Sequence, residues 1–249
     1  MSIIAVYNLK GGVGKTSTAV NLAFASAKDG NRTLLWDLDP QGSATFYYRI
    51  KPKVKGGTDK LVRGKRELDR AIRGTDFDHL DLLPADFSYR HMDQALDAVN
   101  KPIRRFNKLL KPLTETYDHL FLDCPDGLAT LTESIFFATD ILLIPLIPTT
   151  LSLLTFERIR KYLRKESKKP PKVLPFFCMV DRRKRLHKDT LEAYADGKDG
   201  FLAASIPFAS AVERMGIERA PLLSYDRRSR AARAYGTLWE EIQSHLDTA

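Results

Sequence analysis

A glycine-rich loop near the start of the chain limits what this sequence can fold into more than any other feature. Residues 10–17 read KGGVGKTS, after an apolar run over 3–7 and at the start of a helix-forming stretch over 15–28. Phosphate oxygens need several backbone N–H donors that converge on one point, and glycine lets the chain curl that tightly. A helix that begins at the loop adds free N–H groups and the positive end of its dipole. The order of strand, loop and helix therefore predicts a phosphate-binding P-loop rather than a flexible surface loop with chance lysines.

The side chains of this loop have distinct expected roles. Lys15 is expected to reach the β- and γ-phosphates of a nucleotide, and the Thr16 hydroxyl to take one Mg²⁺ position. Ser17 is expected to touch the α-phosphate. The predicted backbone cradle consists of Gly11, Gly12, Val13 and Gly14.

Short apolar runs rich in β-branched residues alternate with amphipathic stretches along the chain. Predicted strands cover 3–7, 33–36, 80–83, 119–122, 141–144 and 173–180, and predicted helices cover 15–28, 89–110 and 151–165. This alternation predicts an α/β fold, in which helices cover both faces of a mostly parallel twisted sheet. Ligands of such sheets bind at the carboxyl ends of the strands.

We expect one domain over residues 1–249, because no internal repeat, low-complexity tract or linker divides the chain. Residues 43–80 are polar, basic and punctuated by glycine, so they are predicted to form an irregular excursion within that domain. Residues 205–249 are predicted to hold a basic segment followed by a closing helix, which packs on the sheet through leucine and isoleucine side chains.

Acidic residues end two of the predicted strands. Asp37 and Asp39 lie in the sequence WDLDPQG, and strand alternation places both on the same side of a strand end, where Pro40 stops the strand. Asp123 ends the apolar run LFLD. One carboxylate at a strand end is an ordinary turn residue. Three of them beside a P-loop are better explained by Mg²⁺ and a reactive water.

These motifs together resemble one known group of ATPases. The usual first glycine of a P-loop is absent, and Lys10 with Gly11 stands in its place. The loop thus resembles the deviant Walker A loop of the ParA/MinD group, to which the nitrogenase iron protein also belongs. The sequences over 36–42 and 120–125 resemble the second motif and the Walker B strand of that group. The resemblance covers nearly the full chain, is closest to Soj-type ParA proteins without an N-terminal helix-turn-helix, and implies ATP and Mg²⁺ as cofactors.

The resemblance also implies a role for each charged residue of the site. Asp123 would hold Mg²⁺ through water, Asp37 would support the metal shell, and Asp39 would position or activate the attacking water. Lys10 would reach across a dimer that sandwiches ATP and contact the partner's phosphates, in the manner of an arginine finger; a lysine merely solvated at the loop mouth is the alternative. Lys10, Lys15 and Asp39 are therefore the predicted catalytic residues.

Two features of the site are less regular. In related folds the adenine pocket is built from the ends of late strands, which indicates Met179, Asp181, Pro207 and Phe208 as nucleotide contacts. Asp126 follows the Walker B proline at a position where many members of the group have proline or a small residue. This departure does not affect the role expected for Asp123, the carboxylate at the end of the preceding strand.

A net charge of +9 and an isoelectric point near 9.5 favour polyanionic partners. Much of the positive charge lies late in the chain, in three clusters of basic residues. Solvated helix faces commonly carry such clusters, but the resemblance implies nonspecific binding of duplex DNA by the ATP-bound dimer. The predicted DNA contacts are Arg182, Arg183, Arg214, Arg219, Arg227, Arg228 and Arg230.

Other classes of protein fit the sequence less well. The longest apolar stretch, 141–147, is interrupted by proline and is far shorter than the roughly 20 residues of a membrane span. No signal peptide is recognisable, so we expect a cytoplasmic, nucleoid-associated protein without a membrane partner. Cys124 and Cys178 are expected to be core residues, and two isolated cysteines argue against an iron–sulfur carrier. Acidic residues in the last helix argue against membrane attachment of the MinD kind.

The resemblance implies a switch that partitions or positions DNA or a protein cargo, with hydrolysis stimulated by a ParB-like or cargo-adaptor protein. The rival from another class is a P-loop ligase that uses ATP on a small molecule, of the dethiobiotin synthetase or cobyrinate amidotransferase kind. Such an enzyme shares the fold but does not need the basic late segment.

Overall fold

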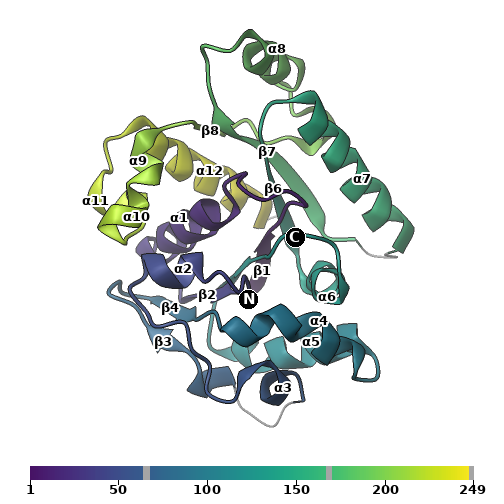
Figure 1. The fold of residues 1–249 in the computed structure, drawn as a ribbon. Helices are drawn as coiled ribbons and strands as arrows, with labels where there is room; N and C mark the ends of the chain where they lie inside the picture. Colours follow the sequence, from purple (N-terminus) through teal and green to yellow (C-terminus); the bar gives the residue numbers. More distant parts are fainter. Residues whose placement is uncertain (64–67, 167–169, 247–249) are drawn as a thin grey trace.

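The computed structural model describes residues 1–63, 68–166 and 170–246 (Figure 1). Its strands are β1 (Ser2–Val6), β2 (Thr33–Asp37), β3 (Arg73–Gly74), β4 (Leu80–Leu83), β5 (His119–Asp123), β6 (Ile141–Leu146), β7 (Lys172–Val180) and β8 (Ser205–Pro207). They form one sheet in the order β3-β4-β2-β5-β1-β6-β7-β8. Each neighbouring pair is parallel except β3 and β4. The predicted parallel sheet is confirmed, whereas β3 and β8 were not predicted.

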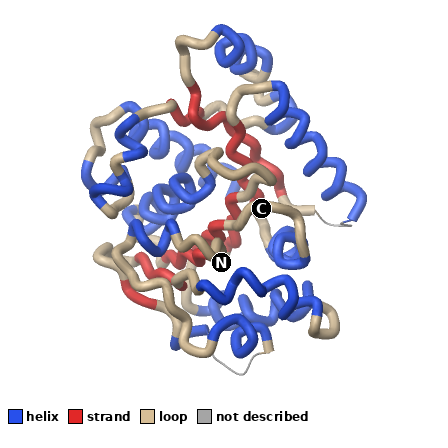
Figure 2. Tube along the Cα trace, in the orientation of Figure 1, coloured by secondary structure: helices blue, strands red, loops and turns tan. Residues whose placement is uncertain are grey.

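Helices cover both faces of this sheet, as Figure 2 shows. The helices that pack on its two faces include α1 (Lys15–Lys28), α4 (Met92–Asp97), α5 (Pro102–Leu110), α6 (Thr130–Ala138), α7 (Thr150–Glu166) and α12 (Arg230–Leu246). Ile4 and Val6 of β1 pack into the core under α1 and α12, while Ala5 of β1 and Tyr7, which follows the strand, pack into the core under α4 to α7. The period of two along a strand therefore produces two apolar layers, one on each side of the sheet.

The predicted helices over 15–28 and 151–165 are confirmed, but the single helix over 89–110 is wrong. A 3₁₀ turn over Phe87–His91 leads into α4, and the chain then leaves the helical conformation before α5 begins. Lys101 has φ 61°, and Pro102 opens α5. Proline cannot donate the backbone hydrogen bond that a continuous helix needs, but its fixed φ suits the first turn of a new one.

The segment over 43–80 contributes to the core of the sheet instead of forming a core of its own. It contains α2 (Ser43–Tyr47), α3 (Gly57–Val62), a short 3₁₀ turn over Leu68–Arg70 and strand β3, and residues 64–67 lie outside the described residues. Leu61 and Val62 are fully buried in the same apolar cluster as residues of α4 and α5. The remaining helices are α8 (Arg185–Ala193), α9 (Ser210–Glu213), α10 (Met215–Glu218) and α11 (Leu222–Tyr225).

The closing helix α12 lies where the sequence predicted it. Leu238 and Ile242 are fully buried against the sheet, and Leu246 is partly buried in the same cluster. Trp239 donates a hydrogen bond from Nε1 to Asp29 at the end of α1, with a distance of 2.7 Å. The last helix is thus fixed to the helix that follows the glycine-rich loop.

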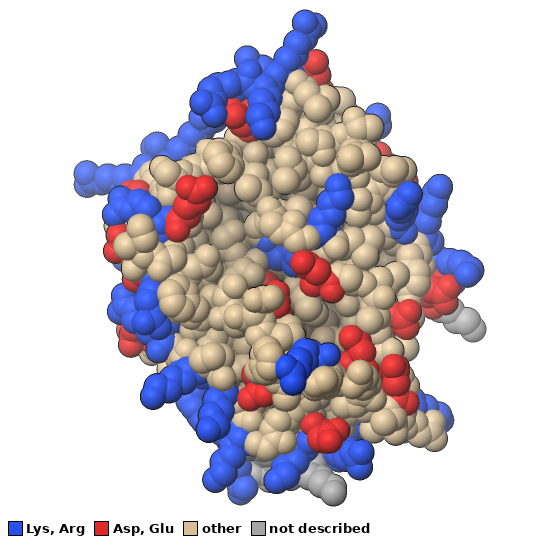
Figure 3. All heavy atoms as spheres, in the orientation of Figure 1, with Lys and Arg blue, Asp and Glu red and all other residues tan. Residues whose placement is uncertain are grey.

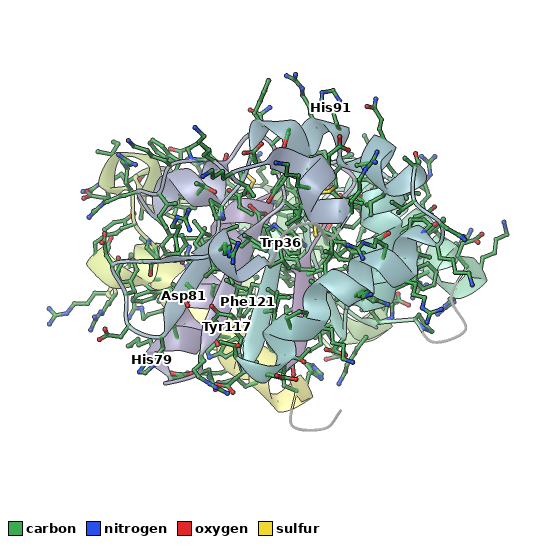
Figure 4. The ribbon with its side chains drawn as sticks, turned by 90° about the horizontal axis from the view of Figure 1, so that it is seen from below. Trp36, His79, Asp81, His91, Tyr117 and Phe121 are labelled. Atoms are coloured by element: carbon green, nitrogen blue, oxygen red, sulfur yellow. The ribbon has the colours of Figure 1, made fainter. Side chains whose placement is uncertain are left out.

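Strands β2 and β4 are held from the opposite face by an aromatic contact and a polar contact. Trp36 stacks on Phe106 of α5, with ring centroids 5.8 Å apart. Tyr117 donates a hydrogen bond to Asp81 Oδ2 at 2.7 Å, and the two side chains lie near each other in Figure 4. The contact of Trp36 thus fixes the strand whose carboxyl end carries Asp37.

Candidate nucleotide site

The glycine-rich loop leaves the sheet at its topological switch point. Strand β1, which precedes the loop, lies between β5 and β6. In the register of the sheet, Asp123 at the end of β5 is opposite Val6 of β1 and Asp37 of β2. The carboxyl ends of three central strands therefore meet beside the loop, where open α/β sheets bind their ligands.

The loop adopts a conformation that requires glycine at two positions. Gly12 has φ 69° and Gly14 has φ 92°, which is the left-handed region. A Cβ atom on Gly14 would lie 2.8 Å from the Sγ atom of Cys178 on β7. Val13 between them is buried, and the Ser17 hydroxyl donates to the Gly14 carbonyl at 3.2 Å. The curl of the loop is thus fixed by backbone conformation and by a close contact with a distant strand.

A cavity of about 380 Å³ opens over this loop. The predicted residues that line it are Gly11, Gly12, Gly14, Lys15, Thr16, Ser17, Asp39, Met179, Pro207 and Phe208. A second cavity of similar size lies beside α8 and is lined by Phe177, His187 and Tyr194 among others, with no contribution from the glycine-rich loop. The structure therefore brings the loop, the second motif and the ends of two late strands together around one space.

The two lysines of the loop occupy different positions. Lys15 is only 7% exposed, and its Nζ atom donates to the Lys10 carbonyl at 3.1 Å and forms an ion pair with Asp126. Lys10 has an exposed side chain, and it is not among the described residues that line the cavity. Its backbone N–H donates to Asn8 Oδ1 at 3.0 Å. One lysine of the loop thus lines the cavity, while the other is exposed and does not line it.

Asp37 is buried and bonded to protein donors. Its Oδ2 atom accepts hydrogen bonds from the backbone N–H and the hydroxyl of Thr45, each at 2.7 Å, and its Oδ1 atom accepts from the Asp39 N–H at 3.3 Å. Burial raises the pKa of Asp37 to about 6, against the opposing effect of the Thr45 bonds. The Asp37 carboxylate thus connects Thr45 in α2 to the backbone of Asp39, the second acidic residue of the motif.

Asp123 is fully buried, and neither of its oxygens has a hydrogen-bond partner among the described residues. Burial raises its pKa well above the usual range, and the nearby Asp37 adds to the shift, while Thr16 and Lys15 oppose it. A buried carboxylate without a partner is costly unless a cation or water satisfies it. Mg²⁺ takes oxygen ligands and usually keeps several waters. Thr16 and Asp123 are the residues that fit this ion.

Asp39 is partly buried and lines the cavity. Its Oδ1 atom accepts a hydrogen bond from the backbone N–H of Gln41 at 2.9 Å, which closes the turn after the strand. Gln41 also lines the cavity, and the motif that contains it could have identified it from the sequence. The second motif thus supplies two side chains, those of Asp39 and Gln41, to the lining of the cavity.

Three of the four predicted adenine contacts line the cavity, but Asp181 does not. Its carboxylate accepts hydrogen bonds from the backbone N–H, Nε and Nη2 of Arg183, at 3.0, 2.9 and 2.9 Å. These bonds hold the pKa of Asp181 down to about 2. Tyr235 of α12 also lines the cavity and donates to the Ser17 hydroxyl at 3.3 Å. No local sequence signal identified Tyr235, because only the packing of the last helix brings it to the loop.

The predicted DNA contacts fall into two groups. Arg182 and Arg183 lie in the turn before α8, and the others follow one another along α9 to the start of α12: Arg214, Arg219, Arg227, Arg228 and Arg230. Figure 3 shows basic side chains gathered at the top of the molecule, over α8, and along the left margin, over α9 to α11.

Several of these arginines already have intramolecular partners. Arg214 pairs with Glu218 at 2.7 Å, and Arg219 donates to the Phe46 carbonyl at 3.3 Å with its guanidinium over the Phe46 ring. By contrast, Arg227 and Arg228 are exposed, and neither takes part in an ion pair within the described part of the chain.

Comparisons with known proteins identify the family of the chain. A family model described as an AAA domain matches residues 1–174. The sporulation initiation inhibitor protein Soj of Bacillus subtilis is 29% identical over 253 residues, which cover 98% of each chain. The chromosome partitioning protein ParA of Caulobacter vibrioides is 30% identical over 256 residues, which cover 98% of this chain and 94% of that protein. The chain belongs to the ParA/MinD family of P-loop ATPases.

A solved structure supports the same fold and ligands. Cobyrinic acid a,c-diamide synthase from Mycobacterium smegmatis, with a bound ATP analogue and magnesium, superposes with a TM-score of 0.81 at 27% identity. The match covers 99% of this chain and 96% of that one. As a member of the ParA/MinD family, the chain uses ATP and Mg²⁺ as cofactors. Within residues 1–63, 68–166 and 170–246, every helix is too short or too polar to cross a lipid bilayer.

Proposed function

We propose that the chain is a ParA-type switch that dimerises around ATP, binds duplex DNA without sequence preference in that state, and partitions or positions DNA or a protein cargo. ATP hydrolysis then separates the dimer and releases the DNA. The observation that carries this proposal is the position of the two loop lysines. Lys15 lines the cavity and is almost completely buried, whereas Lys10 of the same loop is exposed and does not line the cavity. An exposed lysine in the loop is free to contact the phosphates bound by a second copy.

The residues of one subunit have different proposed roles in ATP hydrolysis. Lys15 and the N–H groups of the loop bind and neutralise the phosphates, and Asp39 orients the attacking water. Thr16 and Asp123 would hold a Mg²⁺ ion, which would supply charge neutralisation at the phosphates. Phosphoryl transfer depends mainly on positioning and charge stabilisation, so a positive charge from a partner raises the rate without any covalent step. Turnover should therefore depend on dimerisation.

Replacing Lys10 with alanine should leave ATP binding nearly intact but lower turnover by about a hundredfold, because a charge supplied in trans is worth about that or more in related phosphoryl transfers. Mixing two inactive proteins tests the trans arrangement. In a dimer of Lys10→Ala with Asp39→Ala, one site has an intact Asp39 and receives Lys10 from its partner. We expect the mixture to regain a measurable part of the wild-type rate, while each protein alone stays inactive. Failure of the mixture to regain activity, although both proteins bind ATP, would count against the dimer.

The basic side chains support DNA as the second partner. Phosphate contacts from arginine and lysine give affinity without reading sequence, and that affinity falls steeply with salt. The clearest candidates are exposed and form no ion pair within the described residues: Arg182, Arg227, Arg228 and Arg230. Arg183 and Arg214 would first have to leave their acidic partners.

Replacing Arg227 and Arg228 together with alanine should weaken binding of the ATP-bound protein to arbitrary duplex DNA and lower the salt slope by about 2, one unit for each lost phosphate contact. ATP turnover without DNA should not change. Fluorescence anisotropy at several salt concentrations measures both quantities. The matched control is Lys108→Ala on α5, an exposed cation far from α8 to α12 in Figure 1. Equal DNA affinity in the double variant, or equal binding without ATP, would contradict the proposal.

A cytoplasmic, nucleoid-associated location follows from DNA binding in the ATP state. A ParB-like or cargo-adaptor protein would then stimulate hydrolysis and release the dimer from DNA. A pull-down with the Asp39→Ala protein held in its ATP state is the direct way to find this adaptor.

A P-loop ligase is the alternative function, and the likeness to the cobyrinic acid a,c-diamide synthase of Mycobacterium smegmatis favours it. Such an enzyme would consume a small carboxylic acid in step with ATP, and DNA would not change its turnover. Measuring ATP turnover with and without duplex DNA separates the two functions, because only the switch is expected to respond to DNA.

A further inference from the structure

The carboxylate of Asp126 lies in the phosphate cradle of the chain's own P-loop. Its Oδ1 atom forms the ion pair with Lys15 Nζ, and its Oδ2 atom lies 2.6 Å from the position that a Cβ on Gly11 would occupy. The side chain lines the nucleotide cavity and is 55% exposed, so it reaches the loop from the open side. An internal anion thus occupies the place of a ligand anion.

The backbone around Asp126 is anchored, so its position is defined by the fold. The next residue, Gly127, has φ 91° in the left-handed region that favours glycine. Its carbonyl accepts a hydrogen bond from the Tyr7 hydroxyl at 2.8 Å and another from the Thr132 hydroxyl at 3.2 Å. Tyr7 follows β1 and Thr132 is in α6, so two elements hold the turn after β5. The Asp126 side chain can leave the loop by rotation while its backbone stays in place.

Lys15 has a limited set of partners. Its Nζ atom contacts Asp126 and the Lys10 carbonyl, and the side chain is almost completely buried. Two anions that compete for one buried cation repel each other strongly. A nucleotide whose terminal phosphates bind Lys15 must therefore displace the Asp126 carboxylate, and the displaced carboxylate still lies close to the added negative charge.

We propose that Asp126 is an internal competitor of the terminal phosphate of ATP. In the empty site it neutralises Lys15 and keeps the loop ordered, and in the bound state it lowers nucleotide affinity. The effect is larger for ATP than for ADP, because ATP places one more phosphate beside the carboxylate. Asp126 therefore weakens the hold on nucleotide and favours exchange. This inference rests on ATP binding by the loop, and it does not depend on the dimer or on DNA.

The test compares nucleotide affinities of the full chain by isothermal titration calorimetry with Mg²⁺. Asp126→Asn and Asp126→Ala should each tighten ATP binding by about tenfold, which corresponds to ~1.4 kcal/mol, and should tighten ADP binding less. Asp189→Asn on α8 is the matched control, because it removes the same charge from an exposed position outside the cavity. Its affinities should equal those of the wild type.

Thermal melting of the nucleotide-free variants separates competition from a structural role. Loss of the Lys15 ion pair should lower or leave unchanged the melting temperature of the empty protein, while ATP affinity rises. A residue that only supports the loop would lower both the melting temperature and the affinity. Unchanged or weaker ATP binding in both variants would overturn the proposal, and so would an equal gain for ATP and ADP. The dimer and DNA proposals would remain, because the mixing and salt experiments test them separately.

Discussion

ATP turnover is expected to fall by about a hundredfold or more when Lys15 is replaced with alanine. Lys15 is the buried cation of the loop, and its ammonium group is the charge that the β- and γ-phosphates meet inside the cavity. Because it stabilises charge that grows in the transition state, both affinity and turnover should suffer. Phosphate release assays and calorimetric titration with ATP measure the two effects.

The matched control for this variant is Lys28→Ala, at the exposed end of the same helix α1. It removes a lysine from that helix without reaching the cavity, so its turnover should stay within about twofold of the wild type. Circular dichroism should give the same helix content for all three proteins. A Lys15→Ala protein that is folded and hydrolyses ATP at a rate near that of the wild type would remove the P-loop assignment.

The long central strands were predictable because each is a continuous apolar run buried on both sides. The two missed strands lack that signal. Strand β3 has two exposed residues, Arg73 and Gly74, and it pairs antiparallel at the edge of the sheet. Strand β8 has three residues and ends at Pro207. Both segments are strands because of the neighbouring strands with which they pair, so a short segment without a long apolar run does not by itself predict a strand.

The wrong single helix over 89–110 has a similar cause. Met92, Leu96 and Phe106 are all buried at helical spacing on the same face, so the apolar pattern continues across the break. Pro102 was the local sign of a new helix, because proline is favoured in a first helical turn. The spacing of apolar residues predicts which face of a helix is buried. It does not predict whether the chain between two buried turns stays helical.

Some residues of the candidate site could be predicted from the sequence, and others could not. Gly14, Lys15 and Thr16 belong to a local motif whose conformation follows from glycine and the start of a helix, so the sequence could place them. Cys178 and Tyr235 reach the same loop from 164 and 221 positions after Gly14, and only the packed structure makes those contacts visible. The sequence shows that Asp126 departs from the pattern of the group, but it does not show the ion pair with Lys15. That contact depends on the anchored turn at Gly127, which places the Asp126 side chain beside the loop.

The orphaned carboxylate at the end of β5 leads to a prediction with two opposite effects. Asp123→Asn should make the nucleotide-free protein more stable by ~1–3 kcal/mol, because it removes a buried charge without partners and keeps the shape of the side chain. The same variant should lose most of its Mg²⁺-dependent ATP turnover, because the neutral amide is a poor replacement for a carboxylate near the ion. A carboxylate that is needed for turnover but destabilises the nucleotide-free protein is expected to give this result: its replacement raises stability and lowers activity.

The pH dependence of the free energy of unfolding is an independent test of the sign of the effect expected for Asp123→Asn. The pKa of Asp123 is raised in the folded state, so the folded protein holds this proton more tightly than the unfolded chain does. The contribution of the group to stability is then greatest below the unfolded pKa and is lost as pH rises through the folded pKa. The stability advantage of Asp123→Asn over the wild type should therefore grow as pH rises from about 4 to neutral values.

The control for this experiment is a carboxylate with the opposite shift. Asp118 pairs with Arg32 at 2.8 Å, and this pairing lowers the pKa of Asp118 to about 2. Its favourable contribution is present above the unfolded pKa and is lost as pH falls, so Asp118→Asn should be less stable than the wild type at neutral pH, by a small amount because the pair is exposed. Thermal melts of the three proteins from about pH 2 to neutral values measure the two trends, because the Asp118 contribution is lost below about pH 4 and the Asp123 effect grows above it. If Asp123→Asn were less stable than the wild type at pH 7 and still hydrolysed ATP, then this carboxylate would already have a partner inside the protein, and another group would have to bind the magnesium ion.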